Sequence, residues 1–279
     1  NILILGENGT GKDVFAHLLY RCSPRYGKPF VTIDLGSIPE QLFESELFGY
    51  EKGAFTDARR AKSGRMEVAT GGTLFLDEIG NLSLPMQAKL LTAIEKRQIT
   101  RLGSTQAVPI DVRLICATNT DIRQMVDEAN FRQDLLYRIN TVEVHIPPLR
   151  ERGNDIILLA EYFLNRYGRK YKKEIRGLTR EAKNKLLKYA WPGNVRELQH
   201  AVERAVILGE GSLLKPENFP FHTIERRKKE EDEILNLEQL ERQTVEKALC
   251  LSQGNMTRAA EYLGITRFAL YRKLEKLGL

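Results

Sequence analysis

The residues best placed to do chemistry lie at the start of the chain, in a glycine-rich loop that carries one lysine. This loop spans residues 6–13 (GENGTGKD), and it follows the apolar run NILIL and precedes a helical pattern of apolar residues. Glycines let the backbone turn successive N–H groups inward, and the following helix adds the positive end of its dipole. Lys12 would then place a positive charge on the β- and γ-phosphates of a nucleotide. The order of strand, G-x-x-x-x-G-K loop and helix predicts a phosphate-binding loop rather than a turn that binds nothing.

We name residues 6–13 the P-loop and expect all of them to contribute to a nucleotide site. They are Gly6, Glu7, Asn8, Gly9, Thr10, Gly11, Lys12 and Asp13. Asp13 stands where Ser or Thr ordinarily places a hydroxyl on Mg²⁺. A carboxylate at this position favours a cation but also repels phosphate, so it is a departure from the general pattern.

A second chemical signal is the pair Asp77 and Glu78, which ends the apolar run of residues 71–78 (GGTLFLDE). Burial of the strand fixes both acids at its carboxyl end, beside the phosphates. Asp77 is then the residue that holds Mg²⁺, directly or through water, and Glu78 can polarise the attacking water. Two acids after a strand are a weak signal alone, but they become a strong one in a chain with a P-loop.

Two further residues have open interpretations when the residues are considered alone. Asn119 follows the predicted strand 112–118, where an amide can orient water or sense the γ-phosphate, although a turn asparagine is the simpler interpretation. Phe55 lies among small and charged residues in the predicted loop 49–60, and a loop aromatic ordinarily packs back into the core.

The composition is that of a globular chain without a membrane span. The chain has 279 residues, 42% of them hydrophobic and 29% charged, which is enough for two or three domains. We find no signal peptide and no apolar run of membrane-spanning length. Three widely spaced cysteines, Cys22, Cys116 and Cys250, favour reduced thiols in the cytoplasm. The net charge of +6 permits nucleic-acid binding without demonstrating it.

An α/β core is predicted for residues 1–148 and a helical subdomain for residues 149–221. The predicted core strands are residues 1–5, 30–35, 112–118 and 142–146 and the apolar part of residues 71–78, with helices at 39–48 and 83–96 and a hairpin at 99–108. The helical part contains helices at 156–171 and 180–189, the second with Thr179 as its expected N-cap, and a capping box at 194–197. Arg196 lies in the first turn of that last helix, where a cation indicates either an anion partner or a salt bridge.

The last part of the chain has the pattern of a helix-turn-helix domain. Residues 222–236 are charged and lack apolar periodicity, which predicts a linker, and residues 237–279 contain three short helices with a Gly264 turn. Basic residues outnumber acidic ones there, so we favour DNA binding over a helical dimerisation module. The predicted DNA-contacting residues are Thr266, Arg267, Phe268, Tyr271 and Arg272.

Together these motifs resemble the bacterial sigma-54-dependent transcriptional activators, enhancer-binding proteins of the NtrC type. The resemblance covers nearly the whole chain, as an AAA+ ATPase domain followed by a Fis-like DNA-binding domain. It rests on residues 6–13 (GENGTGKD), 46–58 (ELFGYEKGAFTDA), 71–78 (GGTLFLDE), 131–138 (FRQDLLYR), 147–152 (PPLRER) and 191–198 (WPGNVREL). It implies a P-loop ATPase core with a parallel sheet, a helical lid and an all-α helix-turn-helix domain. An acid after the P-loop lysine is usual in this family.

The resemblance also implies roles for individual residues. The loop 53–58 matches the family's GAFTGA motif, which implies that Phe55 and Thr56 are exposed and touch sigma-54. The expected contact residues are Gly53, Ala54, Phe55, Thr56, Asp57 and Ala58. Asn119 becomes a sensor of the nucleotide and Arg196 a second sensor. Arg132 and Arg138 become arginine fingers that reach a neighbouring subunit's nucleotide.

Such fingers imply a homo-oligomeric ring of six or seven subunits, with the DNA-binding domains acting as dimers on double-stranded enhancer DNA. The implied cofactors are ATP and Mg²⁺, and the implied activity is ATP hydrolysis that remodels the sigma-54 RNA polymerase holoenzyme. Because the chain opens inside a strand, we expect further residues before Asn1, where family members often carry a receiver or ligand-sensing domain.

Two departures from the family pattern leave alternatives open. Asp57 replaces a glycine of the GAFTGA motif, and Asp34 stands where many members have an Asn that restrains the catalytic Glu. Two acids, Asp34 and Glu78, cannot pair in that way unless one is protonated. Asp57 is the only support for one alternative, an AAA+ DNA-binding regulator of the same ancestry that does not engage sigma-54. The other is a general AAA+ remodeller or helicase loader, which the GAFT loop and the helix-turn-helix disfavour.

Overall fold

The computed structural model describes residues 1–221, 241–242, 244–246, 248–249, 252 and 255–277. The chain divides into two compact units, Asn1–Pro220 and Phe221–Leu279. The predicted linker 222–236 lies outside the described residues, and so does part of the predicted helix that follows it. Among the described helices, none is both long and apolar enough to cross a membrane.

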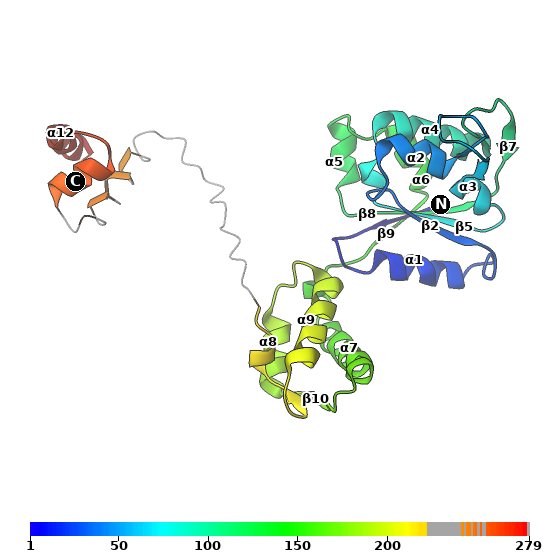
Figure 1. The fold of residues 1–279 in the computed structure, drawn as a ribbon. Helices are drawn as coiled ribbons and strands as arrows, with labels where there is room; N and C mark the ends of the chain where they lie inside the picture. The colour runs from blue at the N-terminus through cyan, green and yellow to red at the C-terminus, as the bar shows by residue number, and fades with distance from the viewer. Residues whose placement is uncertain (222–240, 243, 247, 250–251, 253–254, 278–279) are drawn as a thin grey trace. The chain divides into compact units, whose positions relative to one another are not determined.

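A five-stranded parallel sheet forms the centre of the first unit (Figure 1). In spatial order its strands are β2 (Phe30–Asp34), β5 (Thr73–Asp77), β8 (Arg113–Thr118), β1 (Ile2–Leu5) and β9 (Val142–His145). Strands β5 and β8 are buried over nearly their whole length, as expected for parallel strands covered on both faces. The predicted α/β core is confirmed, and all five strands bring their carboxyl ends to one edge.

Helices cover both faces of this sheet. Helix α1 (Lys12–Arg21) lies on one face, and α2 (Glu40–Leu47), α4 (Leu84–Lys96) and α6 (Gln133–Ile139) lie on the other (Figure 1). The smaller elements are β3 (Gly49–Tyr50), β4 (Lys62–Ser63), α3 (Arg65–Val68), η1 (Ile79–Asn81), β6 (Gln98–Thr100), β7 (Ala107–Pro109) and α5 (Ile122–Asp127). Strands β6 and β7 pair antiparallel, which confirms the predicted hairpin.

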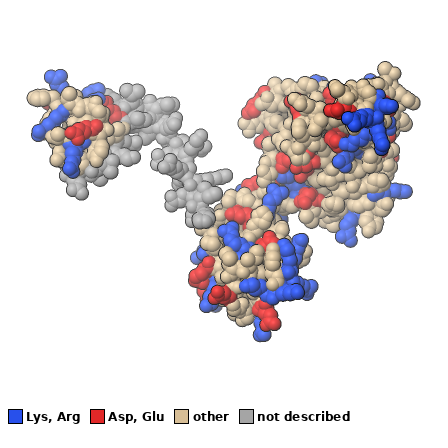
Figure 2. All heavy atoms as spheres, in the orientation of Figure 1, with Lys and Arg blue, Asp and Glu red and all other residues tan. Residues whose placement is uncertain are grey.

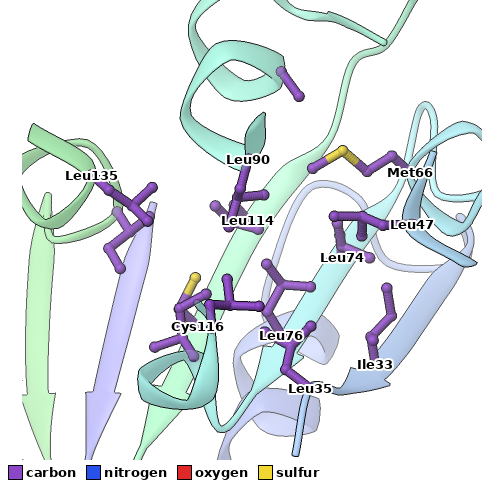
Figure 3. Packing of buried hydrophobic residues seen from close by; sticks show 14 of the residues in the cluster. Ile33, Leu35, Leu47, Met66, Leu74, Leu76, Leu90, Leu114, Cys116 and Leu135 are labelled. Carbon is purple, nitrogen blue, oxygen red and sulfur yellow. The ribbon is translucent and has the colours of Figure 1, made fainter. Parts of the chain in front are cut away.

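The core on the α2–α4 face is an interlocked layer of aliphatic side chains. Figure 3 shows Leu74 and Leu76 of β5 beside Leu114 of β8, with Leu90 of α4 above them. Helix α4 also places one polar side chain, Gln87, in a fully buried position. Gln87 can be buried because its amide hydrogen-bonds the carbonyls of Leu82 and Asn130 and the backbone N–H of Arg132.

The helical part of the first unit consists of three main helices and short connections. They are η2 (Leu149–Glu151), α7 (Asp155–Tyr171), β10 (Gly177–Leu178), α8 (Arg180–Lys188), α9 (Asn194–Leu208), β11 (Leu213–Leu214) and η3 (Pro216–Asn218). The side chain of Thr179 caps α8 as predicted, accepting from the N–H of Ala182 at 3.2 Å. The small parallel pair β10–β11 was not predicted, because two-residue strands carry no periodic signal.

The predicted capping box at the start of α9 is wrong in its first residue. Gly193, not Asn194, is the N-cap, and the carboxylate of Glu197 accepts from the N–H of Gly193 at 2.8 Å. Asn194 is the first helical residue, with a positive φ of 52°. Its side chain therefore does not cap the helix, and it hydrogen-bonds Glu7 and Asn8 of the P-loop instead.

The second unit has the predicted helix-turn-helix elements. Helix α11 (Met256–Tyr262) is capped by the side chain of Asn255, and α12 (Arg267–Leu277) follows a turn at Gly264 with φ +65°. Among the described residues, Leu270 and Leu274 of α12 pack on Ala259 and Ala260 of α11 and on the helical residues Val245 and Ala248. Of the cysteines, Cys22 and Cys116 are free, whereas Cys250 lies outside the described residues.

Candidate functional site

The P-loop, the acidic pair and Asn119 meet at the carboxyl edge of the sheet. Strand β1 pairs with β8 so that Leu5 lies opposite Thr118, and the N–H of Gly6 donates to the carbonyl of Thr118 at 3.3 Å. Strand β5 lies on the other side of β8 and ends at Asp77. Gly6 and Asn119 both line a cavity of about 380 Å³. The sequence predicted these residues as separate motifs, and the strand order brings them together.

Lys12 is buried inside the P-loop, with an exposed fraction of 6%. Its Nζ donates to the carbonyl of Gly6 at 3.0 Å and to that of Glu7 at 3.4 Å. Within the described part of the chain, no acidic side chain forms an ion pair with Lys12. The ammonium group is therefore hydrogen-bonded to two backbone carbonyls, and an anion could bind it without breaking a salt bridge.

The backbone around the P-loop has a conformation that requires glycine. Gly11 precedes α1 with φ +95°, in the left-handed region that glycine adopts at little cost. The hydroxyl of Thr10 donates back to the carbonyl of Glu7 at 2.8 Å, and Thr10 is 3% exposed. The loop is thus shaped by internal contacts, as a preformed phosphate site requires.

Asp77 and Glu78 lie half-buried beside this lysine. Burial raises the pKa of both carboxyls, the charge of Lys12 lowers it, and the neighbouring charge of Asp34 raises it further. The N–H of Glu78 donates to Asp77 Oδ1 at 3.0 Å, and Glu78 adopts a left-handed φ of 55°. A non-glycine residue held in that conformation stores strain, and such residues concentrate at functional sites.

Asp34 lies close to the acidic pair because β2 and β5 are in register, with Asp34 opposite Asp77. Its Oδ1 accepts from the N–H of Gly36 at 3.0 Å. A β-carbon added at Gly36 would lie 3.4 Å from that oxygen and 3.8 Å from the Cβ of Glu78. Asp34 and Glu78 therefore both lie close to Gly36. That Asp34 cannot restrain Glu78 in the way an asparagine would stays a prediction.

The carboxylates suit a magnesium ion that is shared with phosphate oxygens. Among the described residues, no group of three or more His, Cys, Asp or Glu side chains could hold a metal by itself. Mg²⁺ is ordinarily held by one or two carboxylates together with substrate phosphates and water, so a complete protein cage is not needed. Asp77, half-buried next to Lys12, fits this donor set.

Glu7 was predicted as part of the nucleotide site, but its side chain does not face the loop interior. It forms a bidentate ion pair with Arg150 of η2 and also accepts from the amide of Asn194. The N–H groups of Val195 and Arg196 donate to the carbonyl of Gly9 at 2.9 and 3.3 Å, while the Arg196 residue is exposed. Sequence reasoning missed Arg150 and Asn194, although both lie in motifs that it had singled out.

The two candidate arginine fingers differ in their surroundings. Arg132 is the N-cap of α6, and its guanidinium pairs with Asp134 at 2.6 Å, which holds the pKa of that carboxyl below its ordinary value. Arg138 is exposed near the end of α6, and in the described part of the chain it forms no ion pair. Both residues are thus exposed at the surface of the first unit.

Residues 53–58 (GAFTDA) form an exposed loop, named here the 53–58 loop. Phe55 is 44% exposed, and among the described aromatic rings it contacts only Tyr50, edge-on, which contradicts packing into the core. Thr56 and Asp57 are exposed as well. Ala58 is the exception, because it is 4% exposed and closes the loop through hydrogen bonds with Gly53 and Phe55. The side chain of Ala58 is therefore not part of the exposed surface of this loop.

The base of this loop rests on the β6–β7 hairpin. The N–H of Glu51 donates to the carbonyl of Leu102, and a β-carbon on Gly103 would lie 2.9 Å from the Cβ of Ala54. Helix α4, which follows η1 and the acidic pair, leads directly into β6. The exposed loop and the acidic pair are therefore connected through continuous packed elements.

In the second unit, all predicted DNA-contacting residues are on the surface. They are Thr266, Arg267, Phe268, Tyr271 and Arg272. Phe268 is 83% exposed, and the guanidinium of Arg267 lies 5.7 Å from the ring centre of Tyr271. Figure 2 shows Lys and Arg side chains along the edge of this unit with acidic side chains between them.

Comparison with known families matches each part of the chain. The sigma-54 interaction domain matches residues 1–145, the AAA+ ATPase lid domain matches residues 150–235, and the bacterial regulatory protein family of Fis type matches residues 236–277. These matches agree with the parallel sheet, the helical part and the helix-turn-helix described above.

Individual relatives are similar over the whole chain. The transcriptional regulatory protein ZraR of Salmonella typhimurium is 46% identical over 277 residues, which are 99% of this chain and 63% of ZraR. The regulatory protein AtoC of Escherichia coli is 40% identical over 294 residues, covering 100% of this chain and 63% of AtoC. This chain thus spans less than two thirds of the length of these curated relatives.

A solved structure with bound nucleotide has the same fold. NtrX from Brucella abortus in complex with ATP is similar with a TM-score of 0.72 and 33% identity, covering 100% of this chain and 64% of NtrX. Its complex with ADP gives a TM-score of 0.73 and 34% identity, covering 100% of this chain and 63% of NtrX. From the domain matches, the relatives and this fold, we conclude that the chain belongs to the sigma-54-dependent transcriptional activators.

Proposed function

We propose that this chain hydrolyses ATP to remodel the sigma-54 RNA polymerase holoenzyme at promoters, while its C-terminal domain binds enhancer DNA. The observation that carries the proposal is the convergence of Lys12, Asp77 and Glu78 at one edge of the sheet, in the unit that also presents the exposed Phe55. The first group of residues has the chemistry to turn over a nucleotide. Phe55 offers an aromatic side chain that stays partly exposed in a loop, for which a protein partner is the simplest reason.

The residues divide the hydrolytic work among them. Lys12 and the P-loop N–H groups bind the β- and γ-phosphates, and Glu78 accepts a proton from the water that attacks the γ-phosphate. Asn119 orients that water or responds to the γ-phosphate. Asp77 would hold Mg²⁺, which when bound supplies positive charge to the phosphate oxygens.

The proposal places part of the catalytic machinery in a neighbouring copy. Arg138, exposed and without an ion pair in the described structure, is suited to stabilise charge on a neighbour's nucleotide, and Arg132 could do the same after leaving Asp134. Arg196 would report nucleotide state to the lid. A ring of six or seven copies is the assembly that gives every subunit such a neighbour.

The sigma-54 step is tested by capture. Purified sigma-54 is incubated with the tagged chain in the presence of ADP and a phosphate transition-state analogue, and the bound fraction is compared with that in ADP alone. We expect capture only with the analogue. Normal ATP turnover without any capture would favour a DNA-binding AAA+ regulator that does not engage sigma-54, for which the charge of Asp57 in the contact loop would be the reason.

The DNA step is tested by salt titration. Replacing Arg267 or Arg272 with alanine should weaken binding to all duplex sequences and lower the slope of log affinity against log salt by about 1, because one phosphate contact is lost. The control is Arg242→Ala, whose guanidinium pairs with Glu246 on its own helix. If neither substitution in α12 changes the affinity for DNA, this helix is not part of the DNA interface.

A further inference from the structure

An acidic residue inside a phosphate-binding loop needs a physical explanation. Glu7 is the second residue of the P-loop, where a free carboxylate would repel the phosphates that Lys12 attracts. In the structure this carboxylate is bound on both oxygens by the guanidinium of Arg150, at 2.6 Å and 2.9 Å. A bidentate pair of this kind neutralises the charge and also fixes its direction. The side chain of Glu7 thus points to the helical part of the first unit, residues 149–220, which we call the lid. It does not point to the phosphate site.

Asn194 connects the same carboxylate to the interior of the lid. It is fully buried, and its Nδ2 donates to Glu7 Oε2 and to the carbonyl of Asn8, both at 3.0 Å. Its Oδ1 accepts from the N–H of Leu149 at 2.7 Å. Asparagine also tolerates the left-handed φ of 52° that this position has. One buried amide therefore joins the P-loop, η2 and the start of α9.

Lid residues also bind three successive carbonyls of the P-loop. The carbonyl of Asn8 accepts from Asn194, that of Gly9 from the N–H of Val195, and that of Thr10 from Arg152 at 3.0 Å. In a planar trans peptide the next N–H points opposite to the carbonyl. The lid contacts therefore direct the N–H groups of residues 9, 10 and 11 away from the lid.

The approach at this point is too close for any side chain in the loop. A β-carbon on Gly9 would lie 2.4 Å from the carbonyl oxygen of Gly193 and 3.1 Å from the Cβ of Arg196. The lid is thus in direct contact with the loop backbone, and the orientation of the peptide planes depends on where the lid sits.

We propose that Glu7, Arg150 and Asn194 form a lid clamp, a set of positioning residues that holds the P-loop in its phosphate-binding shape. The Glu7 carboxylate is the group of the loop that the lid binds, and Arg150 and Asn194 are the lid residues that donate hydrogen bonds to it. Nucleotide affinity then depends on a contact that no phosphate touches. This inference rests on the proposed nucleotide-binding function and adds residues that position the site without contacting its ligand.

The test is a double-mutant cycle on nucleotide affinity in the full chain. Glu7→Ala, Arg150→Ala and the double variant are compared with the wild type by titration of a fluorescent ADP derivative and of ATP. Each single variant should bind about tenfold more weakly, and the double variant no more weakly than the weaker single one, because both remove the same grip. The loss of affinity should appear as a higher KM for ATP with kcat nearly unchanged, because the P-loop binds the phosphates in the ground state and the transition state alike. Arg150→Lys should recover part of the affinity by restoring one charged donor.

The matched control is the pair Lys183 and Glu161, which also lies on the lid, at 2.6 Å and with similar exposure to water. Glu161→Ala should leave nucleotide affinity within about twofold, since an exposed pair contributes little. Full affinity in the Glu7 and Arg150 variants, or losses that multiply in the double variant, would overturn the lid clamp.

Thermal unfolding without nucleotide separates the clamp from simple destabilisation. Both Glu7 and Arg150 side chains are 42% exposed, so we expect unfolding midpoints close to that of the Glu161→Ala control. Affinity losses that merely follow lowered midpoints would also overturn the clamp. A wild type that binds ADP but does not turn over ATP would remove the hydrolytic proposal and leave the clamp intact. A wild type that binds no nucleotide would remove both.

Discussion

The P-loop and the 53–58 loop are both short glycine-containing loops, but the first is closely packed and the second is exposed to solvent. In the P-loop, Lys12 is buried and Gly9 has the lid backbone directly against it. In the 53–58 loop, Phe55 is 44% exposed, and a β-carbon on Gly53 would meet nothing within 4 Å. The first loop has its shape set by contacts within the chain, and the second is left open on its outer side.

This difference follows from what each loop has to bind. A phosphate group is small and highly charged, so its site must present fixed dipoles that need no reorganisation. A protein partner supplies its own surface, so a contact loop gains affinity by keeping an aromatic side chain available. Four predictions test this division, from the largest expected effect to the smallest.

The largest effect is expected from Arg138, which would show that the nucleotide site is completed by another copy. Arg138→Ala should lower ATP turnover by ~10³–10⁵ with nucleotide binding retained, as for removal of an arginine finger. Mixing this variant with Lys12→Ala should restore part of the ATPase rate through mixed interfaces. A Lys12→Ala, Arg138→Ala chain lacks Arg138 as well and should restore nothing if Arg138 is the group that acts between copies. If no mixture exceeds its parents, action between copies is not supported.

The next effect concerns Glu78 and places the chemistry at the sheet edge. Glu78→Gln should lower turnover by ~10²–10⁴ because it removes a positioned base, while ATP affinity stays close to normal. Affinity and steady-state rate are measured separately, with the exposed Glu95→Gln on α4 as control. Near-normal turnover would mean that another group accepts the proton.

Glycine substitutions compare the two loops directly. Gly9→Ala combines a left-handed backbone with a 2.4 Å approach to the Gly193 carbonyl oxygen and should lower the free energy of unfolding by ~3 kcal/mol. Gly53→Ala has the same backbone penalty in open space and should cost ~1 kcal/mol. Urea unfolding followed by the fluorescence of Trp191, the chain's one tryptophan, measures both. Equal costs would contradict the view that only the P-loop is closely packed.

The smallest effect on folding and ATPase activity is expected in the 53–58 loop. Phe55→Ala should change the free energy of unfolding by less than ~1 kcal/mol, since it loses only an exposed edge contact with Tyr50. ATP turnover should be unchanged, while capture by sigma-54 in the transition-state complex is lost. Asp57→Gly should keep capture or raise it.

Tyr26→Ala serves as the matched control for this experiment. Tyr26 is 63% exposed and likewise touches one neighbouring aromatic ring, Tyr20. It should keep both ATP turnover and sigma-54 capture. A Phe55→Ala chain that unfolds or loses its ATPase would show that Phe55 supports the core, and the contact proposal for this loop would fail.

Some features of this protein were determined by short stretches of sequence. The order of strand, loop and helix around residues 6–13, the strand that ends at Asp77, and the Thr179 cap were predicted correctly, because each depends on backbone sterics and hydrogen bonds within a few residues. The helix-turn-helix elements of the second unit were predicted for the same reason. Composition alone, by contrast, favoured a buried Phe55, and only the family resemblance implied the exposure that the structure has.

Other features were decided only by the tertiary structure. The strand order places β8 between the P-loop strand and the strand of Asp77, and Glu7 meets Asn194 across 187 positions of sequence. No local pattern specifies such a meeting, because it depends on how the lid packs against the sheet edge. The same holds for Asn194, which sequence reasoning assigned to a helix cap. In the structure Asn194 is buried with a left-handed backbone, and its side chain does not cap α9. It hydrogen-bonds the P-loop instead and so connects that loop to the lid.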